Sequence, residues 1–224
     1  MTAAMELIYV ADPMCSWCYG FAPVIFALTP RFEAQLPLRL MMGGLRAGNP
    51  EVMRAADKED VRQAWTQVGA ATGQPFDLSF FEPESFTYDT EPACRAVVTV
   101  RRLQPTFALA VMALIQQAFY AENRDMTSAN EISCLEEEAG LARQAFAATF
   151  SAPATRNETF GDFLTAPGAG HARFSHPDRR RPGPGLRARD QRLSAARRPS
   201  RTARALAGRR SSRHGVGLRR CANG

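Results

Sequence analysis

Two cysteines, Cys15 and Cys18, stand two residues apart in the segment DPMCSWCYGF at 12–21. Such a pair can exchange disulfides, supply half of a zinc site, or consist of two unreactive thiols in a hydrophobic core. A structural zinc site takes about four ligands, often from a second such pair or from spaced histidines. The other cysteines are scattered, and all three histidines lie beyond residue 165. The spacing therefore favours redox chemistry over zinc binding and over an inert pair.

The segments around the pair predict a strand, a helix and a second strand. Residues 5–11 (MELIYVA) are β-branched and aromatic, and a turn-forming Asp-Pro pair follows them, as expected of a strand. Residues 16–35 repeat apolar side chains every three or four positions, the pattern of one helix face. Residues 36–45 (LPLRLMMGGL) predict a second strand that ends at two glycines. Together these segments form a βαβ unit, whose strands are expected to be parallel with a right-handed crossover.

A helix that begins at the cysteine pair would place Cys15 at its N-terminus and Cys18 one turn later on the same side. Unpaired backbone N–H groups and the positive end of the helix dipole stabilise a thiolate at that first position. They can lower the pKa of such a thiol from about 8.5 to between about 3.5 and 7.5. We therefore expect Cys15 to be the attacking nucleophile and Cys18, the more buried thiol, to resolve the mixed disulfide.

Residues 50–150 differ in kind, because four helical segments follow one another there with no strand between them. Cys94 and Cys134 fall in two of these segments and are interpreted as ordinary helix residues. The four predicted helices cover residues 50–73, 90–103, 106–123 and 128–150. The chain is accordingly divided into an N-terminal βαβ part (1–48), a helical insert (49–150), a return segment (151–165) and a tail (166–224).

The N-terminus lacks the basic start of a secretory signal, and Glu6 interrupts its only apolar run. The longest apolar run elsewhere, at 107–115, has about half the length that crosses a bilayer. We therefore expect a cytoplasmic protein without membrane contact. Stable structural disulfides are uncommon in that compartment, where a Cys-x-x-Cys pair is more often catalytic or metal-binding.

The segment YVADPMCSWCYGF at 9–21, followed by residues 36–45, resembles the start of the DsbA-like thiol–disulfide oxidoreductases. The segment EPACRAVVTVRRL at 91–103 is similar to their cytoplasmic branch of protein-disulfide isomerases, and the resemblance covers about residues 5–165. It implies an α/β, thioredoxin-like fold with an inserted helical domain. It also implies dithiol–disulfide exchange with protein or peptide thiols, without a metal or organic cofactor.

The resemblance also implies roles for the residues near the pair. Cys15 would be the nucleophile and Cys18 the resolving thiol. Trp17 and Tyr19 would shape the dipeptide and its rim and contact the substrate, although hydrophobic packing accounts for both residues equally well. Asp12 is interpreted as a helix-capping carboxylate in preference to a proton carrier.

A second enzyme class shares this fold with its helical insert. Kappa-class glutathione transferases and 2-hydroxychromene-2-carboxylate isomerases use a single serine near the start of the first helix to activate glutathione. Two cysteines at redox spacing argue against that class, while glutathione stays a candidate partner. The direction of the redox reaction does not follow from Ser16 and Trp17, although a cytosolic poise favours reduction or isomerisation.

The tail differs from the rest of the chain in composition. Residues 1–165 carry 12 Lys and Arg against 20 Asp and Glu, whereas residues 166–224 carry 16 Arg and only two acidic residues. The tail is rich in Arg, Pro, Gly, Ala and Ser without helical or strand periodicity, so it is expected to be disordered. Its arginines would bind nucleic acid only nonspecifically, through phosphates.

The family pattern continues instead with a cis-proline loop, two strands and a final helix, for which the tail has no matching sequence. We interpret the tail as the product of a reading-frame change near residue 166. A coding string that specifies residues 166–178 yields AQELGMRGFPTLI after the loss of one base, and this peptide contains the expected Phe-Pro-Thr. Without the missing elements the sheet keeps two strands, fewer than small sheets generally need. We therefore predict a poorly formed sheet and weaker disulfide exchange than in a frame-restored chain.

Overall fold

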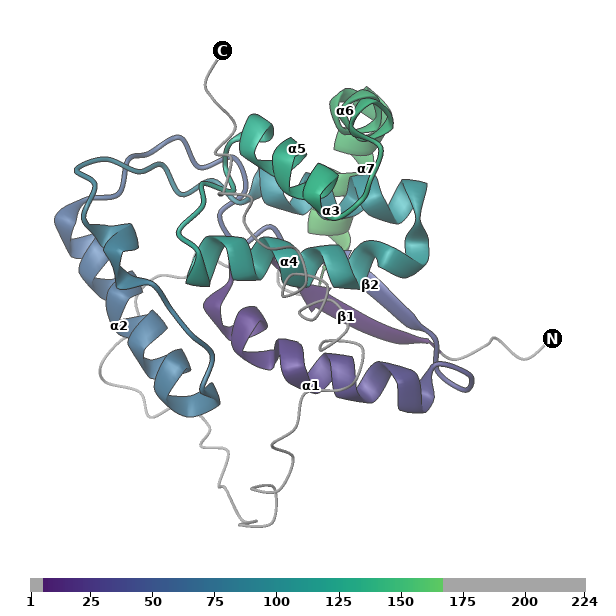
Figure 1. Cartoon of the computed structure of the whole chain (residues 1–224), viewed down its shortest axis with the longest axis horizontal. Coiled ribbons are helices and arrows are strands. Elements are labelled where there is room, and N and C mark those ends of the chain that lie inside the picture. The colour runs from purple at the N-terminus through teal and green to yellow at the C-terminus, as the bar shows by residue number, and fades with distance from the viewer. Residues whose placement is uncertain (1–5, 167–224) are drawn as a thin grey trace, which may run out of the picture. The chain divides into compact units, whose positions relative to one another are not determined.

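The computed structural model describes residues 6–166, and Figure 1 shows how their helices and strands are arranged. The chain begins with strand β1 (Leu7–Ala11), helix α1 (Ser16–Phe32) and strand β2 (Leu38–Met42). The two strands are parallel, with Tyr9 opposite Leu40 at the middle of the pairing. The predicted βαβ unit is therefore confirmed, although both strands are shorter than the sequence pattern suggested. Within the described residues the sheet has these two strands.

The remainder of the described chain is mainly helical, as the sequence predicted for residues 50–150, and the return segment (151–165), for which no helix was predicted, also forms one. The helices are α2 (Ala55–Thr72), α3 (Glu91–Leu103), α4 (Ala108–Ala121), α5 (Ala129–Glu138), α6 (Arg143–Ser151) and α7 (Pro153–Thr165), with short 3-10 helices η1 (Leu78–Phe81) and η2 (Pro105–Phe107). Between residues 6 and 166, none of the helices combines the length and apolar character needed to cross a membrane.

The predicted helix at 128–150 is wrong in one respect, because the structure divides it into α5 and α6. Gly140 lies just after α5 with a φ of 90°. That left-handed backbone conformation ends a helix and is adopted by glycine more readily than by other residues. The apolar periodicity continues across the break, which is why the pattern suggested one helix.

The hydrophobic core lies mainly in the helical part and extends to the start of α1. Helix α3 is its centre, because it packs against α4, α6 and α7, and its residues Ala96, Val97 and Val100 are fully buried. A cluster of aromatic rings surrounds Trp65 of α2. The rings that contact Trp65 are Phe76, Phe80, Phe81, Phe119 and Tyr120. Two rings of this cluster, Phe76 and Tyr120, contact Tyr19 near the start of α1.

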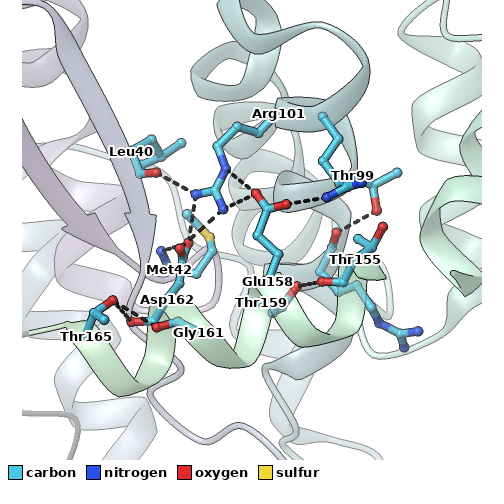
Figure 2. A network of polar contacts seen from close by, with 12 residues as sticks. Leu40, Met42, Thr99, Arg101, Thr155, Glu158, Thr159, Gly161, Asp162 and Thr165 are labelled. Carbon is cyan, nitrogen blue, oxygen red and sulfur yellow. Dashed lines mark hydrogen bonds and ion pairs between the residues drawn. The ribbon is translucent and has the colours of Figure 1, made fainter. Parts of the chain in front are cut away.

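A polar network joins α3 and α7 to the end of β2 (Figure 2). The Arg101 guanidinium donates to the Leu40 carbonyl oxygen at 2.8 Å and to Asp162 Oδ2 at 2.7 Å. The same Asp162 oxygen accepts a hydrogen bond from the Met42 backbone N–H at 2.9 Å. Arg101 also forms an ion pair with Glu158 at 2.7 Å. The network satisfies polar groups of β2 and anchors the strand end that leads into the loop beside the cysteine pair.

Candidate active site

The cysteine pair lies at the start of α1, as predicted. Cys15 is the N-cap residue, with extended backbone and no side-chain capping bond, and Cys18 lies in the first turn. A turn formed by the Asp12 carbonyl oxygen, which accepts from the Cys15 N–H at 3.1 Å, leads the chain from β1 into the helix. The Cys15 carbonyl oxygen then accepts from the Tyr19 N–H at 3.0 Å, as the first residues of a helix require. The sulfur of Cys15 is thus held at a helix N-terminus.

Both thiols of the pair are free and half-buried. The expectation that Cys18 is the more buried of the two is not supported, because both fall in the same intermediate range of exposure. Cys18 does pack against the hydrophobic core. A dithiol at this spacing can close to a disulfide when a substrate disulfide is reduced.

The two thiols differ in how firmly they hold their protons. A hydrogen bond from the Cys18 thiol lowers the pKa of Cys15, as do the backbone N–H groups of Cys18 and Trp17, against the opposing effects of burial and the Asp12 charge. The hydrogen bond to Cys15 raises the pKa of Cys18, and burial raises it further. Cys15 is therefore the sulfur that ionises first, while Cys18 keeps its proton.

Asp12 is not the cap of α1, so that interpretation is wrong. The carboxylate is 3% exposed and lies in the turn before the helix, where Oδ1 accepts from the Met14 N–H at 2.8 Å. Its Oδ2 accepts from the Leu45 N–H at 2.7 Å. Both oxygens therefore bind backbone N–H groups outside α1, and the side chain connects the turn before Cys15 to the loop after β2. Burial raises the pKa of Asp12, and its backbone hydrogen bonds oppose that shift only in part.

Cys94 lies in α3 and Cys134 in α5, as predicted, and both are buried. The Cys94 thiol also has a partner that the sequence did not suggest, because its sulfur donates to Asp12 Oδ2 at 3.4 Å. Burial and the Asp12 charge raise the pKa of Cys94 well above the ordinary value. Cys94 is thus a protonated donor to Asp12, with little tendency to act as a nucleophile. Cys221 lies outside the described residues.

Trp17 and Tyr19, which were both predicted at the rim, point in different directions. Trp17 is 56% exposed, whereas Tyr19 is 5% exposed. The Tyr19 ring stacks on Tyr120 with centroids 4.9 Å apart and meets the edge of Phe76 at 5.3 Å. Residues two apart in a helix lie on nearly opposite faces, so the two rings cannot share one surface. The structure favours packing for Tyr19 and leaves Trp17 accessible to a substrate.

Two further tyrosines that the sequence analysis missed lie against the pair. The Tyr88 hydroxyl donates to the Met14 carbonyl oxygen at 2.6 Å and so supports the residue before Cys15. The hydroxyl of Tyr9 in β1 is buried near both sulfurs. Aromatic residues in a strand or a loop usually belong to the core, so no pattern in the sequence separates these two from the others.

Among residues 6–166, no group of three or more His, Cys, Asp or Glu side chains is arranged to hold a metal ion. The peptide bonds in this part of the chain are all trans. The predicted tail, with its arginines and its interpretation as an out-of-frame product, lies outside the described residues apart from Ala166.

No protein-family model matches the chain, and no curated protein matches it. Solved structures do match. A protein of Nitrosomonas europaea assigned as a protein disulfide isomerase is 33% identical, with a TM-score of 0.68, over 75% of this chain and 80% of that chain. The cytosolic disulfide reductase DsbM of Pseudomonas aeruginosa is 27% identical, with a TM-score of 0.61, over 75% of this chain and 81% of its own. DsbM has also been solved with GSH.

A DsbA oxidoreductase of Streptomyces coelicolor shares the fold at 18% identity and a TM-score of 0.54. These matches confirm the predicted α/β, thioredoxin-like fold. The identity and coverage of the Nitrosomonas match, together with the position of the cysteine pair at a helix N-terminus, settle the classification. The chain belongs to the DsbA-like thiol–disulfide oxidoreductases.

Proposed function

We propose that this protein exchanges disulfides with protein or peptide thiols, with Cys15 as the nucleophile and Cys18 as the resolving thiol. The observation that carries the assignment of roles is the position of Cys15 at the N-cap of α1, where backbone N–H groups and the Cys18 thiol stabilise its thiolate. The first attack needs a thiolate, and Cys15 has the lowered pKa. The resolving thiol should stay protonated until the mixed disulfide forms, and Cys18 has the raised pKa.

The reaction proceeds in two exchanges. The Cys15 thiolate attacks one sulfur of a substrate disulfide, the substrate S–S bond breaks, and the other substrate sulfur leaves as a thiolate that takes up a proton. Cys18 then loses its proton and attacks the Cys15 sulfur, which releases the second substrate thiol. The substrate gains two electrons and two protons, and the enzyme is left with a Cys15–Cys18 disulfide.

A thiol reductant must then return the enzyme to its dithiol form. We propose glutathione for this role, supported by the structure of DsbM with GSH. Two successive attacks by glutathione would regenerate both thiols and release oxidised glutathione. DsbM is a cytosolic reductase, and we propose the same compartment and the same direction here. Trp17, exposed between the two cysteines, is the proposed contact for the substrate.

The Cys18→Ser variant tests the assignment of roles. It keeps the attacking thiol but cannot resolve the mixed disulfide, so it should accumulate a covalent adduct with a disulfide-bonded substrate such as insulin. The adduct should be visible on a non-reducing gel and should disappear on addition of dithiothreitol. The matched control is Cys15→Ser, which should give no adduct. An adduct formed equally through Cys18 in that control would contradict the assignment.

A further inference from the structure

The hydroxyl of Tyr9 has an unusual environment for a buried polar group. Tyr9 lies at the middle of β1, paired with Leu40, and its ring is 6.1 Å from that of Phe21 in α1. The hydroxyl oxygen is buried, and it makes no hydrogen bond of regular geometry with any residue in 6–166. Buried hydroxyl groups normally have a partner, because removing one from water without compensation is unfavourable. A phenylalanine would fill the same space without that penalty, so the hydroxyl is not explained by packing.

The Tyr9 ring packs against Phe21, which lies one helical turn after Cys18 on the same face of α1, so Tyr9 lies against the face of the helix that carries Cys18. Burial, followed by the negative charge that Cys18 and then Cys15 can carry, raises the pKa of Tyr9, with a smaller contribution from hydrogen bonding to Cys18. The phenol therefore stays protonated while Cys15, whose pKa is lowered, titrates, and it remains available as a donor. Of the two sulfurs, Cys18 has the larger effect on Tyr9, and the negative charge of Asp12 helps to raise the pKa of Cys18. A thiolate at Cys18 thus needs a compensating donor beside it, and the Tyr9 hydroxyl lies there without a regular partner.

We propose that the Tyr9 hydroxyl donates a hydrogen bond to the Cys18 sulfur as Cys18 becomes a thiolate, and so accelerates the resolution of the mixed disulfide. This inference rests on the proposed roles of Cys15 and Cys18. During the step Cys18 gives up its proton and attacks the Cys15 sulfur. The bond from Cys15 to the substrate breaks, and the departing substrate thiolate takes up a proton. Tyr9 keeps its own proton throughout and takes no part in the electron balance.

Single-turnover reaction of the reduced, full-length protein with Ellman's reagent separates the two steps. Attack by Cys15 releases one thionitrobenzoate, and resolution by Cys18 releases a second. In Tyr9→Phe the second release should slow about tenfold, as expected for the loss of a hydrogen bond to a charged group, while the first changes little. The pH at which the second release reaches half its maximal rate should also rise, because the Cys18 thiolate is less stabilised.

Tyr120→Phe is the matched control. The Tyr120 hydroxyl is also buried without a hydrogen bond of regular geometry in the described part of the chain, and the side chain with which it interacts through hydrogen bonding is Tyr88, whereas for Tyr9 it is Cys18. Its loss should therefore leave the second release at the wild-type rate. Tyr9→Met removes the same hydroxyl with a different side chain and serves as a second variant if Tyr9→Phe does not fold.

Four outcomes decide the question. A slowed second release with an unchanged first release supports the proposal. A second release at the wild-type rate and pH profile in folded Tyr9→Phe overturns it, as does an equal slowing of both steps, which indicates a merely structural role. If the wild-type protein itself releases only one thionitrobenzoate, the proposed roles of the cysteines fail, and the role of Tyr9 fails with them.

Discussion

The Cys15→Ser variant should reduce insulin disulfides no faster than the uncatalysed exchange between insulin and the reductant. A serine hydroxyl is not ionised near neutral pH, and the backbone N–H groups at the start of α1 cannot compensate for the loss of the sulfur nucleophile. This is the largest effect expected of any substitution on activity. It is measured as the rate of insulin reduction with glutathione or dithiothreitol as the electron donor.

Cys94→Ala is the control for this loss, because it removes a thiol near the pair that the proposed reaction does not use. The folded variant should retain disulfide reductase activity, and circular dichroism should be used to confirm that it is folded. The Cys15→Ser protein should also be assayed for glutathione-dependent isomerisation. Persistence of that activity without Cys15 would favour a serine-based glutathione enzyme and would contradict the proposed function.

The second large effect concerns stability and Glu136 in α5. Glu136 is 1% exposed, and neither of its carboxylate oxygens has a hydrogen-bond partner within residues 6–166. Burial raises the pKa of Glu136 from 4.5 to about 8. Between about pH 4.5 and pH 8, the folded protein holds a proton on Glu136 that the unfolded chain has released. The free energy of unfolding therefore falls as the pH rises through this window. The slope is roughly 1.4 kcal/mol per pH unit, and the loss over the window is about 4 kcal/mol.

Glu136→Gln should remove this dependence. The glutamine keeps the shape of the protonated side chain, so the variant and the wild type should be equally stable below about pH 5. Above that pH the variant should become the more stable protein, by up to about 4 kcal/mol near the upper end of the window. Urea unfolding at a series of pH values measures both curves.

Glu137→Gln provides the comparison for Glu136→Gln. The neighbouring Glu137 side chain is 55% exposed and pairs with Arg143 at 3.2 Å. Its replacement should leave the slope of stability against pH close to that of the wild type, because an exposed ion pair contributes little. The account of Glu136 would be wrong if Glu136→Gln showed the same slope as Glu137→Gln.

The parts of the fold that depend on local pattern were predictable. Residues 5–11 and 36–45 predict strands because of their composition and the turn residues that bound them, and β1 and β2 lie within those limits. The start of α1 at the cysteine pair also follows from the sequence. The break at Gly140 was missed because the apolar repeat continues through it, while one residue in a left-handed conformation is enough to end a helix.

The surroundings of the cysteine pair depended on contacts that no local pattern carries. The Leu45 N–H that Asp12 binds is 33 residues away along the chain, and the Met14 carbonyl that Tyr88 binds is 74 residues away. An aspartate before a helix is a common cap, so the sequence favoured that interpretation. Only the approach of the loop after β2 shows where the second carboxylate oxygen is used.

The expected weakness of a two-stranded sheet stays a prediction. In the described residues β2 gains support from outside the sheet, because Asp162 of α7 accepts the Met42 N–H at 2.9 Å. Arg101 holds that carboxylate in place (Figure 2). These two side chains contact β2. The other strand, β1, carries Tyr9 and leads directly into the turn before Cys15.

The ionisation of a single sulfur atom underlies every step of the proposed chemistry. Thiolate absorbance in the ultraviolet, followed against pH in the folded Cys18→Ser and wild-type proteins, reports it directly. In the wild type, Cys15 should be half ionised at a pH clearly below the value of about 8.5 for a free cysteine, and Cys18→Ser should move that midpoint upward, although a serine hydroxyl can still donate weakly. A wild-type midpoint at or above the free value would contradict the account.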